Sequence, residues 1–170
     1  MKSKEPFNPH KMKDMLVRLL DLPDISEKEQ QLAKENIVFR RPIPPEKSFV
    51  CDWVIEHFGQ YWKNETEAAF SHLPVNCYIA QRDNEILGFA CFESTAKNFF
   101  GPTGTLEGMR GKGIGKILLI KSLQTMKEMG YAYAIIGGIG PADFYKNTVN
   151  ASIIEGSEIS IYQNLIRKKP

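Results

Sequence analysis

Arg110-Gly111-Lys112-Gly113-Ile114-Gly115-Lys116 is a glycine-rich basic turn that leads directly into an amphipathic helix. The first N–H groups of a helix lack intrahelical partners and lie at the positive end of its dipole, so they stabilise an anion when the side chains are small. The three glycines remove side chains, and Arg110, Lys112 and Lys116 add positive charge. The turn therefore favours a multiply charged phosphate ligand, such as a pyrophosphate, over a single carboxylate.

The spacing of these glycines excludes two common nucleotide sites. A P-loop needs Gly, four residues and then Gly-Lys-Ser/Thr, but Arg110 stands in place of the first glycine and Ile117 in place of Ser or Thr. A dinucleotide fingerprint needs a third glycine three residues after the second, and Lys116 or Leu118 occupies that place in the two registers. The turn therefore indicates neither ATP nor NAD.

Composition and charge limit the class of protein. The 170 residues carry a net charge of +2, which fits one globular domain. A chain of this length buries about two thirds of its unfolded surface. Cys51, Cys77 and Cys91 are odd in number, lie in apolar surroundings and lack metal-ligand spacing, which is typical of reduced core thiols. We therefore expect a cytoplasmic protein without a metal.

The chain shows no signal for secretion, membranes or nucleic acid. Lys2, Lys4, Lys11 and Lys13 interrupt the N-terminal residues, which leaves no apolar core for a signal peptide. No later stretch approaches the roughly 20 apolar residues of a membrane span. The near-neutral charge gives no case for nucleic acid. We therefore expect neither a membrane nor a nucleic-acid partner.

Hydrophobic spacing in the first 36 residues predicts two helices. Five apolar residues before Pro23 repeat at helical intervals, namely Met12, Met15, Leu16, Leu19 and Leu20. Ser26 and Glu29 have the spacing of a capping box, which predicts a second short helix ending near Asn36. We therefore expect a helical extension over residues 1–36 that packs on a domain spanning residues 37–170.

The remaining pattern predicts a mixed α/β domain. Strands are expected at residues 37–39, 77–81, 86–93, 99–106 and 131–136, and near Ile153 and Ile161. Helices are expected around residues 50–58 and over residues 65–73, 113–128 and 142–149. A polar turn at residues 82–85 joins two of the strands in a hairpin.

Arg110, Gly113 and Gly115 match the pattern Gln/Arg-x-x-Gly-x-Gly/Ala, which resembles the acetyl-CoA pyrophosphate loop of the GNAT superfamily of N-acetyltransferases. The order of elements over residues 37–166 is similar to that superfamily as well. The motifs Phe100-Gly101-Pro102-Thr103-Gly104-Thr105 and Phe144-Tyr145 resemble one bacterial branch of it. The resemblance implies a central, mostly antiparallel sheet flanked by helices, with two central strands splayed apart.

The resemblance also implies which residues hold acetyl-CoA as a co-substrate. The pantetheine arm of CoA lies between the splayed strands, where it pairs with backbone groups, and the N–H near Thr105 faces the thioester carbonyl. Pro102 and Gly104, which are unusual inside an ordinary central strand, fit such a splayed element. The implied residues are Thr103, Thr105, Leu106, Glu107, Arg110, Gly111, Lys112, Gly113, Ile114, Gly115 and Lys116.

Acetyl transfer to an amine needs a proton donor for the leaving thiolate and a path for the amine's proton. By resemblance, Tyr145 matches the common tyrosine acid of the superfamily. For the base we prefer Glu93, which could equally bind a cationic substrate, and we leave Glu107, His72 and ordered water open. The asparagine that many members place seven residues before the tyrosine is Gly138 here, which puts that CoA contact in doubt.

Hints about the acceptor lie in the first half of the chain. Phe58, Tyr61 and Trp62 form either part of the core, which we favour, or an apolar or sugar-stacking wall. Glu65 and Glu67 either attract an amine or belong to the first turn of an ordinary helix.

We therefore expect an acetyl-CoA-dependent N-acetyltransferase that acts by direct attack on a primary amine, most simply that of a small molecule. Two alternatives stay open among enzymes: a longer acyl-CoA as donor, and a protein N-terminus as acceptor. A catalytically idle CoA-binding sensor or interaction module is the alternative from another class. A homodimer is left open as the oligomeric state.

Overall fold

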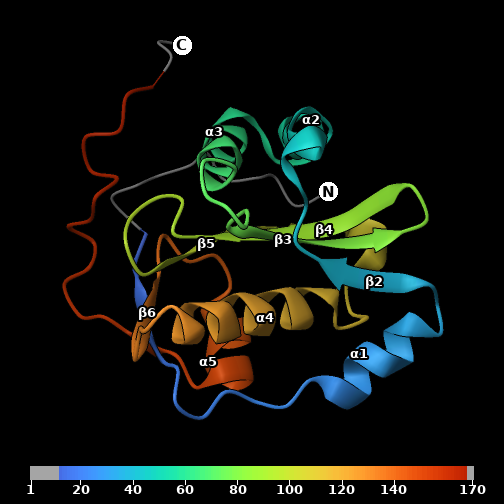
Figure 1. The fold of residues 1–170 in the computed structure, drawn as a ribbon. Coiled ribbons are helices and arrows are strands. Elements are labelled where there is room, and N and C mark those ends of the chain that lie inside the picture. Colours follow the sequence, from blue (N-terminus) through green and yellow to red (C-terminus); the bar gives the residue numbers. More distant parts are fainter. Residues whose placement is uncertain (1–11, 168–170) are drawn as a thin grey trace.

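One seven-stranded sheet runs through the protein in the order β2-β3-β4-β5-β6-β1-β7, in a computed structural model that describes residues 12–167 (Figure 1). The strands are β1 (Met15–Arg18), β2 (Ile37–Arg40), β3 (Cys77–Arg82), β4 (Glu85–Phe92), β5 (Phe99–Thr105), β6 (Tyr133–Ile136) and β7 (Ser152–Ile153). All neighbouring strands are antiparallel except β5 and β6, which are parallel. The predicted mixed and mostly antiparallel sheet is therefore confirmed.

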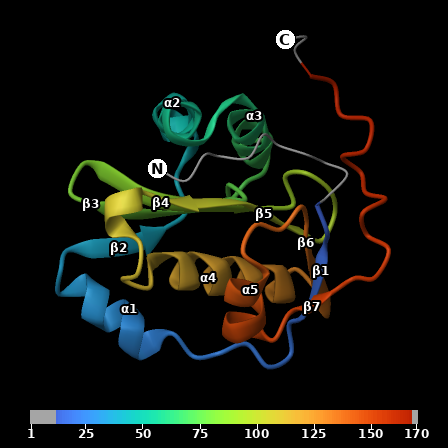
Figure 2. The ribbon, with the colours of Figure 1, turned by 180° about the vertical axis from the view of Figure 1, so that it is seen from behind.

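Helices cover both faces of this sheet. They are α1 (Ser26–Ala33), α2 (Lys47–Phe58), α3 (Gln60–Ala69), α4 (Ile114–Glu128) and α5 (Ala142–Val149), with short 3-10 turns η1 (Pro44–Glu46) and η2 (Glu107–Met109). Figures 1 and 2 show α2 and α3 on one face, and α4, α1 and α5 on the other. Each layer has its own cluster of buried apolar residues. Within residues 12–167, no helix is long and apolar enough to cross a membrane.

The first of the two helices predicted for the N-terminal segment is wrong, because Met15–Arg18 forms strand β1. Met15, Val17 and Leu19 are buried, whereas the residues between them are exposed. This alternation of period two buries one side of β1, and the strand pairs with β6 and β7 as Figure 2 shows. Pairing inside the sheet therefore overrides a spacing that also fits a helix. The boundary expected at residue 36 stays a prediction.

The second N-terminal helix is confirmed as α1, although the predicted capping box does not form. The helix has no side-chain cap, and the Ser26 hydroxyl instead donates to the Asp24 carboxylate at 2.6 Å. Two other predictions differ from the structure, one for the start of α3 and one for the C-terminal segment. α3 begins at Gln60 instead of near Glu65, and the segment around Ile161 is a series of turns instead of a final strand.

The central strands β5 and β6 pair only over the start of β5 and the end of β6. Their parallel pairing involves only Phe99 with Ile135 and Phe100 with Ile136. On its other side β5 stays paired with β4 as far as Thr105, with a register shift between Ala90 and Phe92. Residues 101–105 therefore leave one edge of β5 unpaired by β6, which confirms the splayed central strands.

Candidate active site

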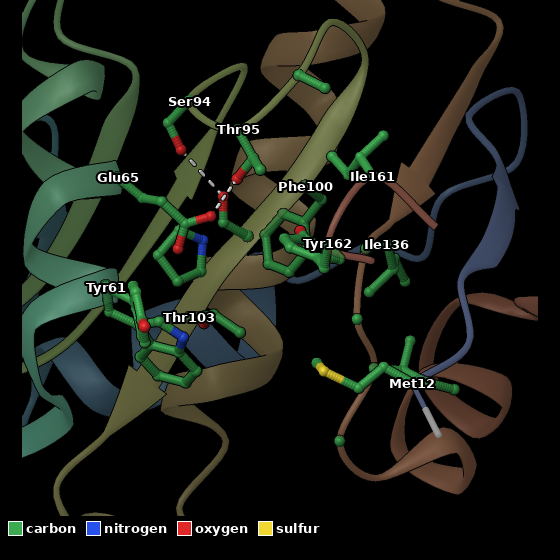
Figure 3. A pocket seen from close by; sticks show the side chains of 18 of the residues that line it. Met12, Tyr61, Glu65, Ser94, Thr95, Phe100, Thr103, Ile136, Ile161 and Tyr162 are labelled. Carbon is green, nitrogen blue, oxygen red and sulfur yellow. Dashed lines mark hydrogen bonds between the residues drawn. The ribbon is translucent and has the colours of Figure 1, made fainter. Parts of the chain in front are cut away.

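A cavity of about 840 Å³ lies where β5 and β6 diverge (Figure 3). It is lined by α3, the loop after β4, the start of β5, the segment after β6, and the C-terminal turns. Because these parts are far apart in sequence, only the folded chain forms the cavity.

Tyr145 on α5 lines this cavity, as does Thr103 of β5. Its ring packs edge to face against Phe100 and Phe144, at centroid distances of 6.4 and 5.1 Å. The side chain is only 6% exposed, and this burial raises the pKa of Tyr145 to about 12. Tyr145 is therefore a neutral phenol, able to donate a proton, over the whole physiological pH range.

The glycine-rich turn begins α4 and lies against the far end of β5. Gly113, with a φ of 93°, caps the helix, and Gly111 has a φ of 80°. A side chain at Gly115 would lie 3.6 Å from the Thr105 hydroxyl and 3.9 Å from the Phe144 ring. The turn therefore lies near Thr105 at one end of β5, and residues 101–103 of the same strand line the cavity with Tyr145.

The residues of the turn fit an anion in different ways. Within residues 12–167 Arg110 and Lys116 form no ion pair, whereas Lys112 pairs with Glu35 at 3.0 Å. Ile114 is buried and anchors the first turn of α4 in the core. A Cβ at Gly113 would lie 2.6 Å from the flexible end of the Lys28 side chain, which can move aside, so the φ of 93° is the main reason for glycine at this position.

The structure brings none of the three predicted side-chain bases to the cavity. Glu93 is not among the lining residues, and its carboxylate accepts the backbone N–H of Asn98. Glu93 also hydrogen-bonds with Tyr131, which raises the pKa of that phenol. Glu107 is exposed in η2 and His72 is exposed beyond α3. These contacts tie Glu93 into the turn after β4 instead of directing it at a substrate.

The carboxylate that does line the cavity is Glu65, on α3 (Figure 3). It is half-buried and accepts a hydrogen bond from the Thr95 hydroxyl, and burial raises its pKa. Tyr162 lines the same cavity from the C-terminal turns. Burial raises the pKa of Tyr162, and the negative charges of Glu65 and Asp14 add to the shift.

Sequence reasoning did not single out Thr95 or Tyr162. Thr95 follows β4 in a loop, and its proximity to Glu65 depends on the packing of α3 over the sheet. Tyr162 lies next to Ile161, in the segment that the sequence predicts as a strand. That prediction concerns backbone pairing and gives no indication that the Tyr162 ring lines a cavity. No local signal in the sequence brings either residue to the cavity.

The aromatic residues near the end of α2 divide between the two readings left open. Phe58 stacks on Trp62 at 5.2 Å and packs against Phe89 in the core. It also explains Gly104, since a Cβ there would lie 2.5 Å from the Phe58 ring. Trp62 also packs against Phe89, so it belongs to the core and lines the cavity as well, whereas Tyr61 lines the cavity and is part of the wall. In residues 12–167 no cluster of three or more His, Cys, Asp or Glu side chains has the arrangement of a metal site.

Comparisons with known proteins place these features in a family context. The sequence model of the Acetyltransferase (GNAT) family matches residues 44–145. No curated protein matches the chain.

Solved structures share the fold at low identity. One is a fungal GCN5-related glucosamine N-acetyltransferase region of a multi-domain GH3 beta-N-acetylglucosaminidase, with 16% identity, 84% of this chain and 20% of that chain covered, and a TM-score of 0.68. A GCN5-related N-acetyltransferase from Sphaerobacter thermophilus gives 18% identity, 84% and 48% coverage, and a TM-score of 0.66. One from Kribbella flavida gives 13% identity, 84% and 54% coverage, and a TM-score of 0.53. The chain thus spans from a fifth to about half of these structures.

Proposed function

The chain belongs to the acetyltransferase (GNAT) family, a family of acyltransferases, and on that basis we propose that it transfers an acetyl group from acetyl-CoA to the primary amine of a small molecule. The observation that carries the proposal is that one strand, β5, has the glycine-rich turn at its Thr105 end, an edge that β6 leaves unpaired, and residues 101–103 in the cavity that contains Tyr145. A long, anionic donor with a reactive end fits this arrangement.

The turn would hold the pyrophosphate, and the β5 edge would pair with the pantetheine arm. Small residues and free N–H groups at the start of α4 favour an anion, and the charges of Arg110 and Lys116 add to this attraction. Residues 101–105 of β5 offer backbone groups on the side that faces away from β4. Acetyl-CoA supplies an activated acyl group as a thioester when bound there.

The transfer forms a bond between the amine nitrogen and the acyl carbon and breaks the bond from that carbon to sulfur. Tyr145 would donate its hydroxyl proton toward the departing sulfur, since burial keeps the phenol neutral. The backbone N–H near Thr105 would donate to the carbonyl oxygen as negative charge develops on it. The amine must lose a proton in the same reaction.

Water in the cavity is the carrier that we propose for the amine's proton. The contacts of Glu93 and the exposed positions of Glu107 and His72 support this choice over the three predicted side chains. The cavity of about 840 Å³ has room for ordered water beside a small acceptor.

A panel of amines tests the proposed function. Release of CoA from acetyl-CoA should rise well above the rate without amine for at least one member of the panel. Binding of acetyl-CoA without any such release would instead support a CoA-binding module that does not catalyse transfer.

The turn is tested by Gly113→Ala, measured by calorimetry with CoA. We expect a loss of affinity of about tenfold or more, because the φ of 93° is unfavourable for alanine and the added methyl group would stand at the N-terminus of α4, where the anion is proposed to bind. Gly130→Ala is the matched control, since Gly130 has a φ of 104° at the other end of α4 but no neighbour within 4 Å of an added Cβ. Equal affinities for both variants would contradict the assignment of the turn.

A further inference from the structure

The described wall of the cavity carries negative side-chain charge and no positive side-chain charge. Among the described residues 12–167, 23 line the cavity, and Glu65 is the only one of these with a charged side chain. Neither lysine nor arginine occurs among the 23. An anionic group on an acceptor would therefore find no cationic partner in the described wall, whereas an ammonium would find a carboxylate.

The surroundings of Glu65 favour the binding of a cation. It extends from α3 toward the loop after β4, as Figure 3 shows, and the Thr95 hydroxyl fixes its orientation through a hydrogen bond. Within the described residues it forms no ion pair, although it is half-buried. Burial raises its pKa, which means that its negative charge is poorly solvated. A bound ammonium would offset this unfavourable burial.

The rest of the wall suits an uncharged body. Flat or apolar side chains surround the space, among them Tyr61, Trp62, Phe100, Ile136 and Tyr162. Aromatic faces contact a ring-shaped body over a large area, whether it is an aryl group or the apolar face of a sugar. A volume of about 840 Å³ accommodates a single ring with a short side chain.

We propose that the acceptor is a primary amine on an uncharged ring-bearing body, and that Glu65 determines this specificity by binding the ammonium and repelling carboxylate and phosphate groups. This inference rests on the proposed function for the reaction itself, but the binding preference is a property of the cavity alone. Glu65 acts in the proposal as a binding residue that captures the protonated amine. Deprotonation follows through water.

Matched pairs of acceptors test the preference. Phenethylamine and phenylalanine differ by a carboxylate, and glucosamine and glucosamine 6-phosphate differ by a phosphate. Within the better-accepted pair, we expect kcat/KM to be at least about tenfold higher for the member without the anion. The reason is that repulsion between the Glu65 carboxylate and a nearby carboxylate or phosphate weakens binding by more than about tenfold. The two pairs also distinguish an aryl body from a sugar body. A preference for the anionic member of either pair would overturn the proposal.

Glu65→Gln tests the residue. In this variant KM for the preferred amine should rise by about tenfold while kcat changes by less than about threefold, and the discrimination within each pair should shrink. Glu67→Gln is the matched control, because Glu67 lies on the same helix but outside the cavity, where it pairs with Lys63 at 3.8 Å. A fall in kcat with unchanged KM would make Glu65 a base and overturn its role in binding.

A direct measurement separates this inference from the proposed function. Calorimetry with CoA-loaded protein should give a tighter Kd for phenethylamine or glucosamine than for its anionic counterpart, and Glu65→Gln should remove the difference. If this pattern appears without any acetyl transfer, the proposed function fails and the inference on Glu65 stands. If transfer occurs but the Kd values within both pairs are equal, the inference fails and the proposed function stands.

Discussion

At the scale of single residues, Tyr145 combines access to the cavity with almost complete burial of its ring. The residue was predicted from the sequence as the acid, and the structure places it in the wall of the cavity. What the sequence could not show is the cause of its raised pKa, because burial between Phe100 and Phe144 depends on how α5 packs on the sheet. The same limit applied to Glu93, whose partner Asn98 lies across a turn that only the structure describes.

Removal of the Tyr145 hydroxyl should affect the chemical step. We expect Tyr145→Phe to lower kcat by about 10²-fold, the lower end for loss of a general acid, while KM changes little. The ring still fills its place against Phe100, so unfolding by denaturant should stay close to that of the unchanged protein. Steady-state kinetics above and below saturation measures both parameters, and an unaltered kcat would end the assignment of Tyr145 as the acid.

The pKa of Tyr145 also predicts how stability depends on pH. The folded state raises this pKa from an ordinary value of about 10 to about 12, so the folded protein binds the proton more tightly than the unfolded chain does. The resulting stability is fully present below pH ~10 and decreases as the pH rises toward ~12, by on the order of 2 kcal/mol.

Urea unfolding at pH 8 to 11.5 measures this loss. Because burial also raises the pKa of Tyr162, both the unchanged protein and Tyr145→Phe should lose stability in this range. We attribute to Tyr145 only the difference between the two slopes, and parallel slopes would contradict the role of its burial.

At the scale of elements, the sequence predicted most of the sheet and its helices, because each of their hydrophobic patterns fits only one type of element. α4, which begins within the glycine-rich turn, and α5, found at the predicted residues 142–149, belong to this group. β1 does not, since its apolar residues fit periods of both two and 3.6, and pairing with a strand more than 100 residues away decides between them. Short elements such as the predicted strand near Ile161 fail for a related reason, because they depend on a partner strand.

Leu19 and Leu20, the two residues that follow β1, test whether the helix predicted from the sequence forms. Both would lie on the apolar face of the helix predicted from the sequence, but in the structure Leu19 is 0% exposed and Leu20 is 67% exposed. We expect Leu19→Ala to lower the free energy of unfolding by about 2–5 kcal/mol. Leu20→Ala should change it by about 0.5 kcal/mol or less. Chemical denaturation compares the two, and similar losses for both would favour the helix.

At the scale of the whole molecule, the cavity depends on long-range assembly. In the proposed function the donor would lie along β5 and the start of α4, which are close in sequence, whereas the wall proposed for the acceptor combines α3 with the C-terminal turns. The Tyr61 hydroxyl donates to the carbonyl of Ile166 at 3.1 Å, which links these two distant segments. Motifs in the sequence could therefore indicate the donor, but the acceptor wall has no contiguous pattern to recognise.

Tyr162→Ala should weaken binding of the acceptor without weakening binding of the donor. We expect KM for the amine to rise by about tenfold, because an aromatic wall of the acceptor space is lost, while the Kd for acetyl-CoA stays within about twofold. Calorimetry and steady-state kinetics on the same preparation give both values. Equal losses in both would show that the C-terminal turns also serve the donor.

The position of these turns has a practical consequence. Ile161, Tyr162 and Leu165 line the cavity but lie beyond residues 44–145, the part of the chain that matches the family. Under the proposed function, changes confined to these three side chains should therefore alter acceptor selectivity while the residues proposed to bind the acyl donor stay unchanged. Such variants would reprogramme the acceptor separately from the donor, without replacing the segment that holds Asp14 through Ser157.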